Sequence, residues 1–358
     1  MNIWILNQVF DFQETHIFSK LPSLGFNVTA FHDPEMEEWK KKVLEAGGVE
    51  CIPFKFRSRM DFKATKELKR ELEKRPCDLI YATINRPLAT ALRALRGRSD
   101  IKVVGYRGTM GHISRFDPAA WLTYFNPRLN HIVAVSDAVK NYLVNKIGIS
   151  ESKVTRIYKG HSIEWYENGK LLSPLPEAPS GTVTFAFSGV VRPVKGVEYL
   201  IDAILSLPRE LPVRLLIIGK IVEKKMEEKI RHLCESDSRF VWIGYREDAT
   251  AIEGKIDVMV MPTVEREGLA RAVIEAMAQG VPAIVSNVGG LPEIVEDGVS
   301  GFVVPPRDSK ALATAIEKLV KDNSLRKRFG IAAKERIISH FNYRNSVEEF
   351  GALFRRLI

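Results

Sequence analysis

The sequence predicts an α/β protein of two Rossmann-like, doubly wound domains that face each other across a cleft. Three observations lead to this expectation. The chain has 358 residues, of which 45% are apolar, enough for two hydrophobic cores. Short β-rich runs alternate with helical patterns, as in parallel sheets built from βαβ units. The alternation occurs as two series, separated by a proline-rich stretch at residues 171–181.

The predicted strands follow in chain order, each before a stretch that can form a helix. The first series is Asn2–Leu6, Asn27–Phe31, Asp78–Ala82, Ile101–Tyr106 and His131–Val135. The second series is Thr182–Ser188, Arg214–Gly219, Phe240–Ile243, Val258–Met261, Ala283–Ser286 and Phe302–Val304. Parallel strands of this kind are expected to place their ligands at the carboxyl ends of the sheet.

The proline-rich stretch LLSPLPEAPSG has the composition of a hinge, so we expect a first domain at residues 1–170 and a second at 171–342. The last segment, Tyr343–Ile358, carries apolar residues at helical spacing, including Val347, Phe350 and Phe354. It predicts an amphipathic helix that must dock on another part of the protein.

The formal charge of +9 and the pI near 9.3 favour an acidic partner such as nucleic acid, anionic lipid or a phosphorylated ligand. Residues 1–170 hold 27 basic against 19 acidic side chains, whereas residues 171–358 hold 26 against 25. The excess therefore lies in the first domain. Three cysteines without metal-ligand spacing predict reduced thiols in the cytosol. The first residues do not resemble an export signal, and no run is apolar enough to span a membrane.

The segment Met261–Pro306 contains the first candidate site. A predicted strand ends at Met261, a loop holds Glu267 and Gly268, and we expect a helix from about Leu269. Backbone N–H groups at a helix start bind anionic or polyhydroxyl ligands. Glu267 and Glu275 are eight residues apart, close to two helical turns of about 7.2 residues, so both carboxylates could face one ligand. A solvated helix face is the alternative interpretation.

The second candidate is Ser188–Gly196, which lies between a strand and a helix at Val197–Leu207. Gly189 allows a close backbone approach, and Arg192 and Lys195 could neutralise a diphosphate. Two exposed basic residues in an ordinary loop are the alternative.

Together, EGLAR, EAMAQGVPAIVSNVGGLPEIVEDGVSGFVVPP and Arg-x-x-Lys-Gly resemble the signature of the family 4 retaining glycosyltransferases (group 1), nucleotide-sugar enzymes of the GT-B fold. The resemblance implies that Glu267 meets hydroxyls of the donor sugar and that Glu275 holds the nucleotide ribose. It also implies that Arg192 and Lys195 stabilise the leaving diphosphate. The remaining donor-binding positions would be Gly189 and the amides of Gly268, Leu269 and Ala270. The chain contains no Asp-x-Asp triplet, and no metal or other cofactor is expected.

The resemblance implies that the first domain carries the acceptor and that the last helix packs back on it, but here the chain departs from the family pattern. Relatives often have a glycine pair in the first loop, where this chain has Asp11 and Phe12; His16 fits the pattern. Asp11 and His16 are therefore acceptor-side candidates. After the strand ending at Tyr106, relatives commonly place a histidine near the reacting sugar. Here either Arg107 substitutes for it or His112 reaches in from the loop.

The expected function is transfer of a sugar, with retention and without metal, from a nucleotide-diphosphate sugar to a glycan or lipid-linked acceptor in cell-surface polysaccharide or lipopolysaccharide synthesis. A GT-B epimerase of sugar nucleotides and a catalytically silent nucleotide-sugar binding module are the alternatives. A dehydrogenase is disfavoured because NQVFDF lacks the G-x-G-x-x-G turn.

The basic segments Trp39–Lys42 and Lys55–Arg70 interleave aromatic and cationic residues. They could bind an anionic membrane surface or an anionic glycan, or form a solvated face. No nucleic-acid motif accompanies them, so nucleic acid is not an expected partner. The expected location is the cytoplasm, with a peripheral position on the inner face of the membrane.

Overall fold

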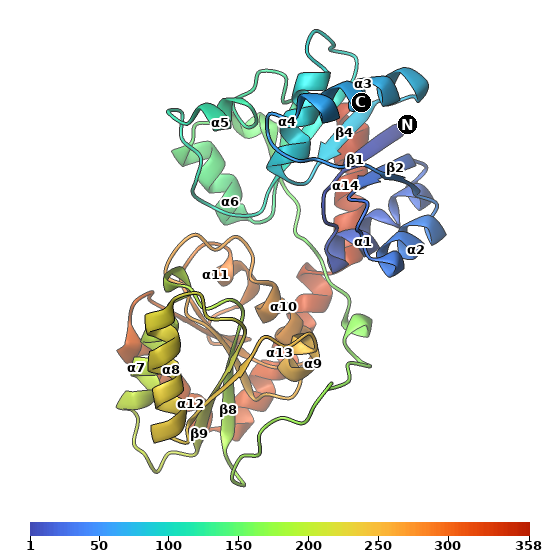
Figure 1. The fold of residues 1–358 in the computed structure, drawn as a ribbon. Coiled ribbons are helices and arrows are strands. Elements are labelled where there is room, and N and C mark those ends of the chain that lie inside the picture. The colour runs from blue at the N-terminus through green and yellow to red at the C-terminus, as the bar shows by residue number, and fades with distance from the viewer. The chain divides into compact units, whose positions relative to one another are not determined.

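The computed structural model describes all 358 residues and divides them into two compact units, each with its own parallel sheet (Figure 1). The first unit comprises Met1–Gly160 and Tyr343–Ile358, and the second comprises His161–Asn342. Residues 161–170, which the sequence assigned to the first domain, therefore pack with the second unit. None of the helices combines the length and the apolar character needed to cross a bilayer.

The first unit has a seven-stranded sheet in the order β3-β2-β1-β4-β5-β6-β7, in which all neighbours are parallel. Its strands are β1 (Asn2–Leu6), β2 (Asn27–His32), β3 (Glu50–Pro53), β4 (Leu79–Ala82), β5 (Lys102–Arg107), β6 (His131–Ala134) and β7 (Val154–Arg156). The five predicted strands are present within about one residue at each end. The sequence missed β3 and β7, which lie at the two sheet edges and are not fully buried, so they lack a continuous apolar run.

Local sequence signals start several helices of this unit. Asp11 caps the first helix by accepting from the backbone N–H of Glu14, and Asp61 and Ser136 cap two later helices in the same way. The helices are α1 (Phe12–Phe18), α2 (Glu38–Ala46), α3 (Phe62–Lys74), α4 (Asn85–Ala94), α5 (Pro118–Trp121), α6 (Asp137–Asn141) and α14 (Tyr343–Leu357).

The C-terminal helix α14 is part of the first unit's core. Its Phe350 ring lies 5.5 Å from Phe18 and 5.3 Å from Tyr81, and Phe354 lies 6.2 Å from Phe26. These rings belong to one buried cluster with the apolar residues of β1, β2 and α1. The amphipathic pattern of the last segment is thus explained by burial against residues about 300 positions earlier in the chain.

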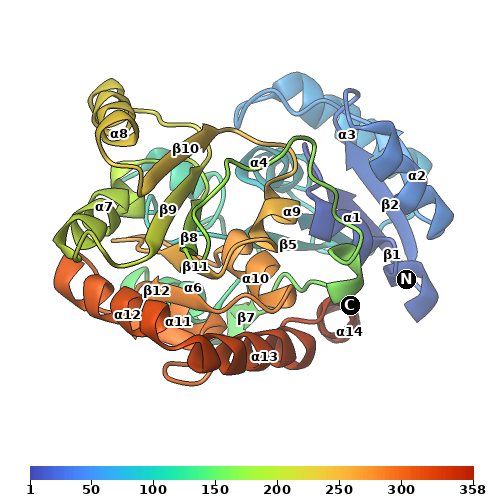
Figure 2. The ribbon, with the colours of Figure 1, turned by 90° about the horizontal axis from the view of Figure 1, so that it is seen from below.

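The second unit has a six-stranded parallel sheet in the order β10-β9-β8-β11-β12-β13, and Figure 2 shows β8, β9 and β10 side by side. Its strands are β8 (Val183–Ser188), β9 (Val213–Ile218), β10 (Phe240–Gly244), β11 (Val258–Met261), β12 (Ala283–Ser286) and β13 (Gly301–Val304). All six predicted strands are confirmed.

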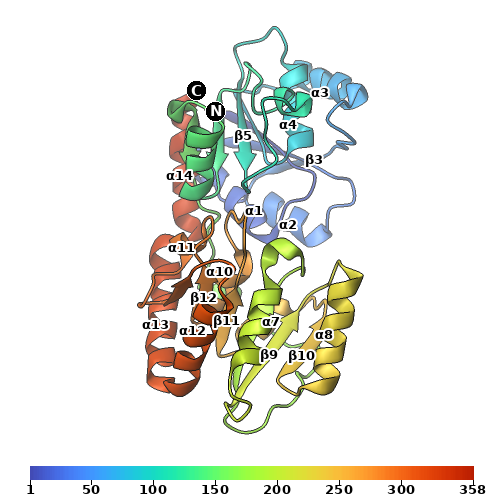
Figure 3. The ribbon, with the colours of Figure 1, turned by 90° about the vertical axis from the view of Figure 1, so that its left-hand side faces the viewer.

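Helices cover this sheet, and α12 and α13 lie next to each other (Figure 3). The helices are α7 (Val197–Ser206), α8 (Lys224–Ser236), α9 (Ala249–Glu253), α10 (Arg271–Ala278), α11 (Leu291–Ile294), α12 (Ser309–Lys321) and α13 (Asn323–His340). Shorter turns of the chain are 3₁₀ at Leu21–Leu24, Glu151–Lys153, Ile163–Trp165 and Pro193–Lys195, and π at Tyr142–Lys146.

Each sheet has one point where the strand order reverses direction. In the first unit it lies between β1 and β4, and in the second between β8 and β11. Loops that leave neighbouring strands in opposite directions open a crevice at such a point, where α/β sheets bind their ligands. The loops after β1, β8 and β11 are therefore the places to look for a site.

Candidate functional site

In the second unit, the loop after β8 is fixed by two glycines with positive φ. Gly189, at φ 144°, donates its N–H to the carbonyl of Ile218 over 2.9 Å. Gly196, at φ 66°, lies so close to the loop after β11 that an added Cβ would stand 2.1 Å from the carbonyl oxygen of Pro262. The two loops that flank the switch point therefore touch through their backbones, which no larger residue at 196 would permit.

A charged pair joins the same two loops. The Lys195 Nζ lies 2.6 Å from Oε2 of Glu267, and the Thr263 hydroxyl donates to the same oxygen over 3.0 Å. The side chains of Lys195 and Glu267 are 27% and 12% exposed, so a ligand can reach the pair. Arg192 is exposed and forms no salt bridge, which leaves its guanidinium available to an anion.

The helix expected from Leu269 begins at Arg271, with Ala270 as its cap, and this corrects one argument from the sequence. Glu267 lies in the preceding loop, next to Arg266 at φ 64°, and so the spacing of two helical turns does not set its direction. Lys195 and Thr263 orient it instead. The backbone N–H groups of Gly268, Leu269 and Ala270 find no acceptor in the protein, so they remain available to ligand oxygens.

Glu275 is held on α10 with 6% of its surface exposed. Its Oε2 accepts from the Thr250 hydroxyl over 3.1 Å, and its Oε1 lies 3.1 Å from Nε of Arg271. These two contacts fix the carboxylate between α9 and the first turn of α10. A carboxylate held in this way can accept hydrogen bonds from neighbouring hydroxyl groups at a defined position.

A second carboxyl group, which the sequence did not single out, lies against Glu275. Glu253, the last residue of α9, is 1% exposed; its side chain interacts with Glu275 and with the hydroxyl of Ser188, and its Oε2 has no partner. Burial and the nearby charge of Glu275 raise the pKa of Glu253 well above its usual range. Its position in the chain resembles that of any helix-end acid, so only the fold could reveal that it lies against Glu275.

In the first unit, the switch-point loop carries a partly buried charge network. The Lys159 Nζ lies 2.6 Å from Oδ2 of Asp11 and 2.9 Å from Oε1 of Glu14, while the Asn7 side chain donates to the other Glu14 oxygen over 2.8 Å. Burial alone would lower the pKa of Lys159, but the charges of Glu14 and its other neighbours outweigh that effect and raise it. The structure thus brings Asp11 together with Lys159, whereas Glu14 went unnoticed in the sequence.

His16 lies on α1, where its Nδ1 is 2.8 Å from the carbonyl oxygen of Phe12. Its ring is close to two aromatic rings, with centroids 4.4 Å from Phe12 and 6.4 Å from Trp39. The histidine is half-buried on the first helix after the switch-point loop.

Arg107, at the end of β5, is 8% exposed and is bound to its own loop. It donates to the carbonyl oxygens of Thr109 over 2.7 Å and of Gly111, and its guanidinium lies 5.3 Å from the Tyr124 ring centroid. His112 follows with φ 55°, a conformation uncommon for a residue with a Cβ. The Arg107 side chain therefore shapes the loop that carries His112.

The described chain contains no cluster of three or more His, Cys, Asp or Glu side chains suited to a metal ion. In the second unit, the cations Arg192 and Lys195 and the Glu267 carboxylate are accessible to a ligand at the switch point, whereas Glu275 is 6% exposed. Such a set fits a ligand that has both anionic oxygens and hydroxyl groups.

Two family models match the chain. Glycosyl transferases group 1 matches residues 175–336, which contain the Arg192, Lys195, Glu267 and Glu275 set. Glycosyltransferase Family 4 matches residues 15–165, most of the first unit.

Curated relatives include an uncharacterized glycosyltransferase of Methanocaldococcus jannaschii, 28% identical over 64% of this chain and 59% of its own length. The capsular polysaccharide biosynthesis glycosyltransferase CapM of Staphylococcus aureus is 28% identical over 63% of this chain and 62% of its own length. The matched region thus spans about three fifths of these relatives.

Solved structures share the fold over nearly the whole chain. HepE of Anabaena in complex with UDP superposes with a TM-score of 0.78 and 19% identity, covering 99% of this chain and 100% of that one. A glycosyltransferase of Rickettsia africae gives a TM-score of 0.80 with 18% identity, covering 99% and 98%. The fold is therefore the GT-B fold.

Proposed function

Because the chain belongs to the group 1 glycosyltransferases of family 4, we propose that it moves a sugar from a nucleotide-diphosphate sugar to a glycan or lipid-linked acceptor. The observation that carries this proposal is the Lys195–Glu267 pair at the β8–β11 switch point, beside the unpaired Arg192. The names of CapM and of the lipopolysaccharide core glycosyltransferase LpsE of Rhizobium meliloti support a cell-surface polysaccharide or lipopolysaccharide as the product. The UDP bound in HepE supports a uridine nucleotide among the donors to test first.

In the proposed reaction, the bond between the anomeric carbon and the diphosphate oxygen breaks, and its electron pair leaves with the diphosphate. Arg192 and Lys195 stabilise the negative charge that develops there, with the N–H groups of Gly268, Leu269 and Ala270 as further donors. Glu267 binds hydroxyls of the sugar and Glu275 binds those of the ribose. Two side-chain cations perform the neutralisation that a divalent ion performs elsewhere, so the reaction proceeds without metal, and the product retains the anomeric configuration.

The proposed location is the cytoplasm, on the inner face of the membrane. All three cysteines are free thiols, consistent with a reducing compartment. The excess positive charge of residues 1–170 supports attachment of the first unit to anionic lipids.

The donor assignment is tested with Arg192→Ala and Glu275→Ala, measuring donor binding and turnover with a panel of nucleotide-diphosphate sugars. In each variant, donor affinity or turnover is expected to fall at least tenfold, which corresponds to about 1.4 kcal/mol, because each substitution removes one direct contact with the donor. Arg328→Ala, at an exposed arginine on α13, is the control and is expected to behave as the wild type. Unchanged kinetics in both site variants would refute the assignment.

Product analysis separates the activities. A transferase releases the nucleoside diphosphate and lengthens the acceptor, whereas an epimerase returns an altered nucleotide sugar without needing an acceptor. A binding module shifts the melting temperature with donor but yields no product. Only the first result supports the proposal.

A further inference from the structure

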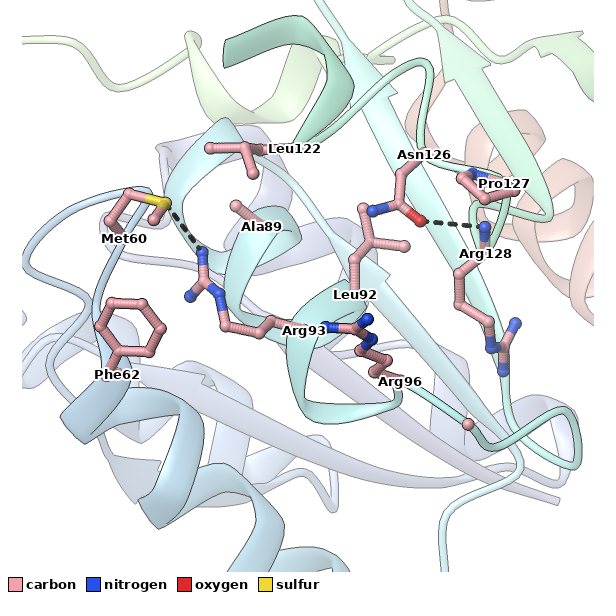
Figure 4. Close-up of a pocket in the computed structure, with 11 residues that line it drawn as sticks. Met60, Phe62, Ala89, Leu92, Arg93, Arg96, Leu122, Asn126, Pro127 and Arg128 are labelled. Carbon is pink, nitrogen blue, oxygen red and sulfur yellow. Dashed lines mark hydrogen bonds between the residues drawn. The ribbon is translucent and has the colours of Figure 1, made fainter. Parts of the chain in front are cut away.

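The first unit contains a cavity of about 640 Å³ along the outer side of α4, a volume typical of ligand pockets (Figure 4). Ala89, Leu92 and Leu122 supply apolar surface, and Met60 and Phe62 lie at one end. The loop Asn126–Arg128 forms the other end. The cavity extends to Gly97, beyond the end of α4. Because α4 begins at the carboxyl ends of the strands, this part of the cavity lies toward their amino ends, away from the switch-point loops.

Three arginines line this mostly apolar cavity. Arg93 and Arg96 are three residues apart at the end of α4, and Arg128 comes from the loop before β6. The Arg96 side chain is exposed and makes no hydrogen bond or salt bridge. The Arg93 guanidinium lies 5.2 Å from the Phe62 ring centroid and donates to the Thr65 hydroxyl over 3.1 Å. Arg128 donates to Asn130 over 2.7 Å and to two backbone carbonyls.

The acids near these arginines are already engaged. Asp61 caps α3 through the N–H of Ala64 and also accepts from the N–H of Arg57. Asp100 is paired with Arg98, with Nε and Oδ1 3.2 Å apart. No carboxylate therefore neutralises Arg93, Arg96 or Arg128 by a salt bridge, and the cavity keeps an uncompensated positive charge beside apolar walls.

The surface around the cavity has the composition of a membrane-binding face. Met60 and Phe62 are 51% and 65% exposed, and Trp121, next to Leu122, is 53% exposed. Lys63, Lys66 and Lys69 on α3 are exposed as well. Exposed aromatic and apolar side chains together with lysines are typical of surfaces that insert at the lipid headgroup level.

We propose that this cavity holds one anionic phospholipid of the membrane, with its phosphate on Arg96 and the start of its acyl chain along Leu92, Leu122 and Phe62. Guanidinium groups suit a phosphate geometrically, and the apolar walls suit the hydrocarbon chain. This inference rests on the proposed membrane attachment and not on sugar transfer. A diffuse basic surface attracts anionic membranes without a defined binding site, and this proposal adds one discrete site for a lipid.

The test measures co-sedimentation of the full chain with vesicles of phosphatidylcholine containing phosphatidylglycerol. Arg96→Ala is expected to weaken binding at least tenfold. Lys69→Ala, the matched control, removes one charge of the same basic face outside the cavity and is expected to weaken binding at most about fivefold, the change for one cation near a membrane. Equal losses in the two variants would mean diffuse attraction and would overturn the proposal.

A soluble lipid separates the cavity from the bilayer. Dihexanoyl-phosphatidylglycerol below its micelle concentration is expected to raise the melting temperature of the wild type but not that of Arg96→Ala. Dihexanoyl-phosphatidylcholine and inorganic phosphate are expected to leave it unchanged. An equal shift of the melting temperature with inorganic phosphate would indicate a site for free phosphate. The absence of a shift with any lipid would mean that the cavity binds no lipid. Either result overturns the proposal. Neither readout depends on glycosyl transfer, so a failure of the lipid proposal can be told apart from a failure of the proposed reaction.

Discussion

The two units have sheets of the same kind and a switch point at the same place, but the cations at the two switch points differ in how many partners they have within the protein. In the first unit, Lys159 is held between two carboxylates, Asp11 and Glu14, and the three side chains are 21%, 31% and 9% exposed. In the second, Arg192 is exposed and unpaired, and the Lys195–Glu267 pair is partly exposed. The difference suggests that the charges of the first unit hold the loop in place, whereas those of the second are available to a ligand.

Arginines show the same contrast. Arg107 at the end of β5 donates to carbonyls of its own loop and stays buried. Arg192 after β8 forms no salt bridge. A cation that has its hydrogen bonds within the protein contributes to stability, and one that lacks them can bind an anion at little cost. Substitutions should therefore affect stability in one unit and function in the other.

The largest expected effect is on stability. Lys159→Met leaves the buried Glu14 carboxyl and the partly exposed Asp11 carboxyl without their cation, and we expect it to lower the free energy of unfolding of the first unit by about 3 kcal/mol, the lower end for breaking a buried pair. Urea denaturation of the full chain measures it. Lys140→Met is the control, because the Lys140–Glu151 pair lies in the same unit with side chains 27% and 71% exposed, and should cost less than about 1 kcal/mol. Similar costs for the two variants would refute the contrast.

The second effect is on turnover. Lys195→Met removes a cation that stabilises the proposed leaving diphosphate. We expect turnover to fall about 100-fold, as for the loss of one preorganised hydrogen-bond donor. The free energy of unfolding should fall by only about 1 kcal/mol, because Lys195 has a single carboxylate partner and Glu267 keeps the Thr263 hydroxyl as a donor. Initial rates and urea denaturation on the same samples provide the measurement, with exposed Lys224→Met as the control. A loss of stability as large as that of Lys159→Met, together with the loss of activity, would show that Lys195 serves stability as Lys159 does.

The smallest effect is a pH dependence in the second unit. Glu253 keeps its proton in the folded state because its pKa is raised, whereas the unfolded chain releases it near pH 4.5. Unfolding then releases a proton, and stability from this residue falls as pH rises above that value, by at most about 1.4 kcal/mol per pH unit. Glu253→Gln, which cannot ionise, should show a flatter dependence between pH 5 and pH 6 in urea denaturation, a difference of at most about 1.4 kcal/mol. Parallel curves for variant and wild type would mean that Glu253 is ionised in the folded protein.

Local patterns in the sequence identified most of the strands and the last helix. Fully apolar runs such as Val258–Met261 identified the interior strands, and the apolar spacing of Val347, Phe350 and Phe354 identified the last helix. The edge strands β3 and β7 escaped because half-exposed strands lack such runs. The candidate residues Arg192, Lys195, Glu267 and Glu275 came from short motifs that stay within one strand-loop-helix segment each.

The sequence by itself determined the element types, the two-sheet architecture and the motifs, because each depends on neighbours along the chain. Only the tertiary structure decided which side chains meet. It brought Lys195 to Glu267, 72 residues away, and Lys159 to Asp11, 148 residues away. It also placed Glu253 against Glu275 and bound Arg107 to its own loop. Charge pairing and burial depend on distances through space, which the order of residues does not contain.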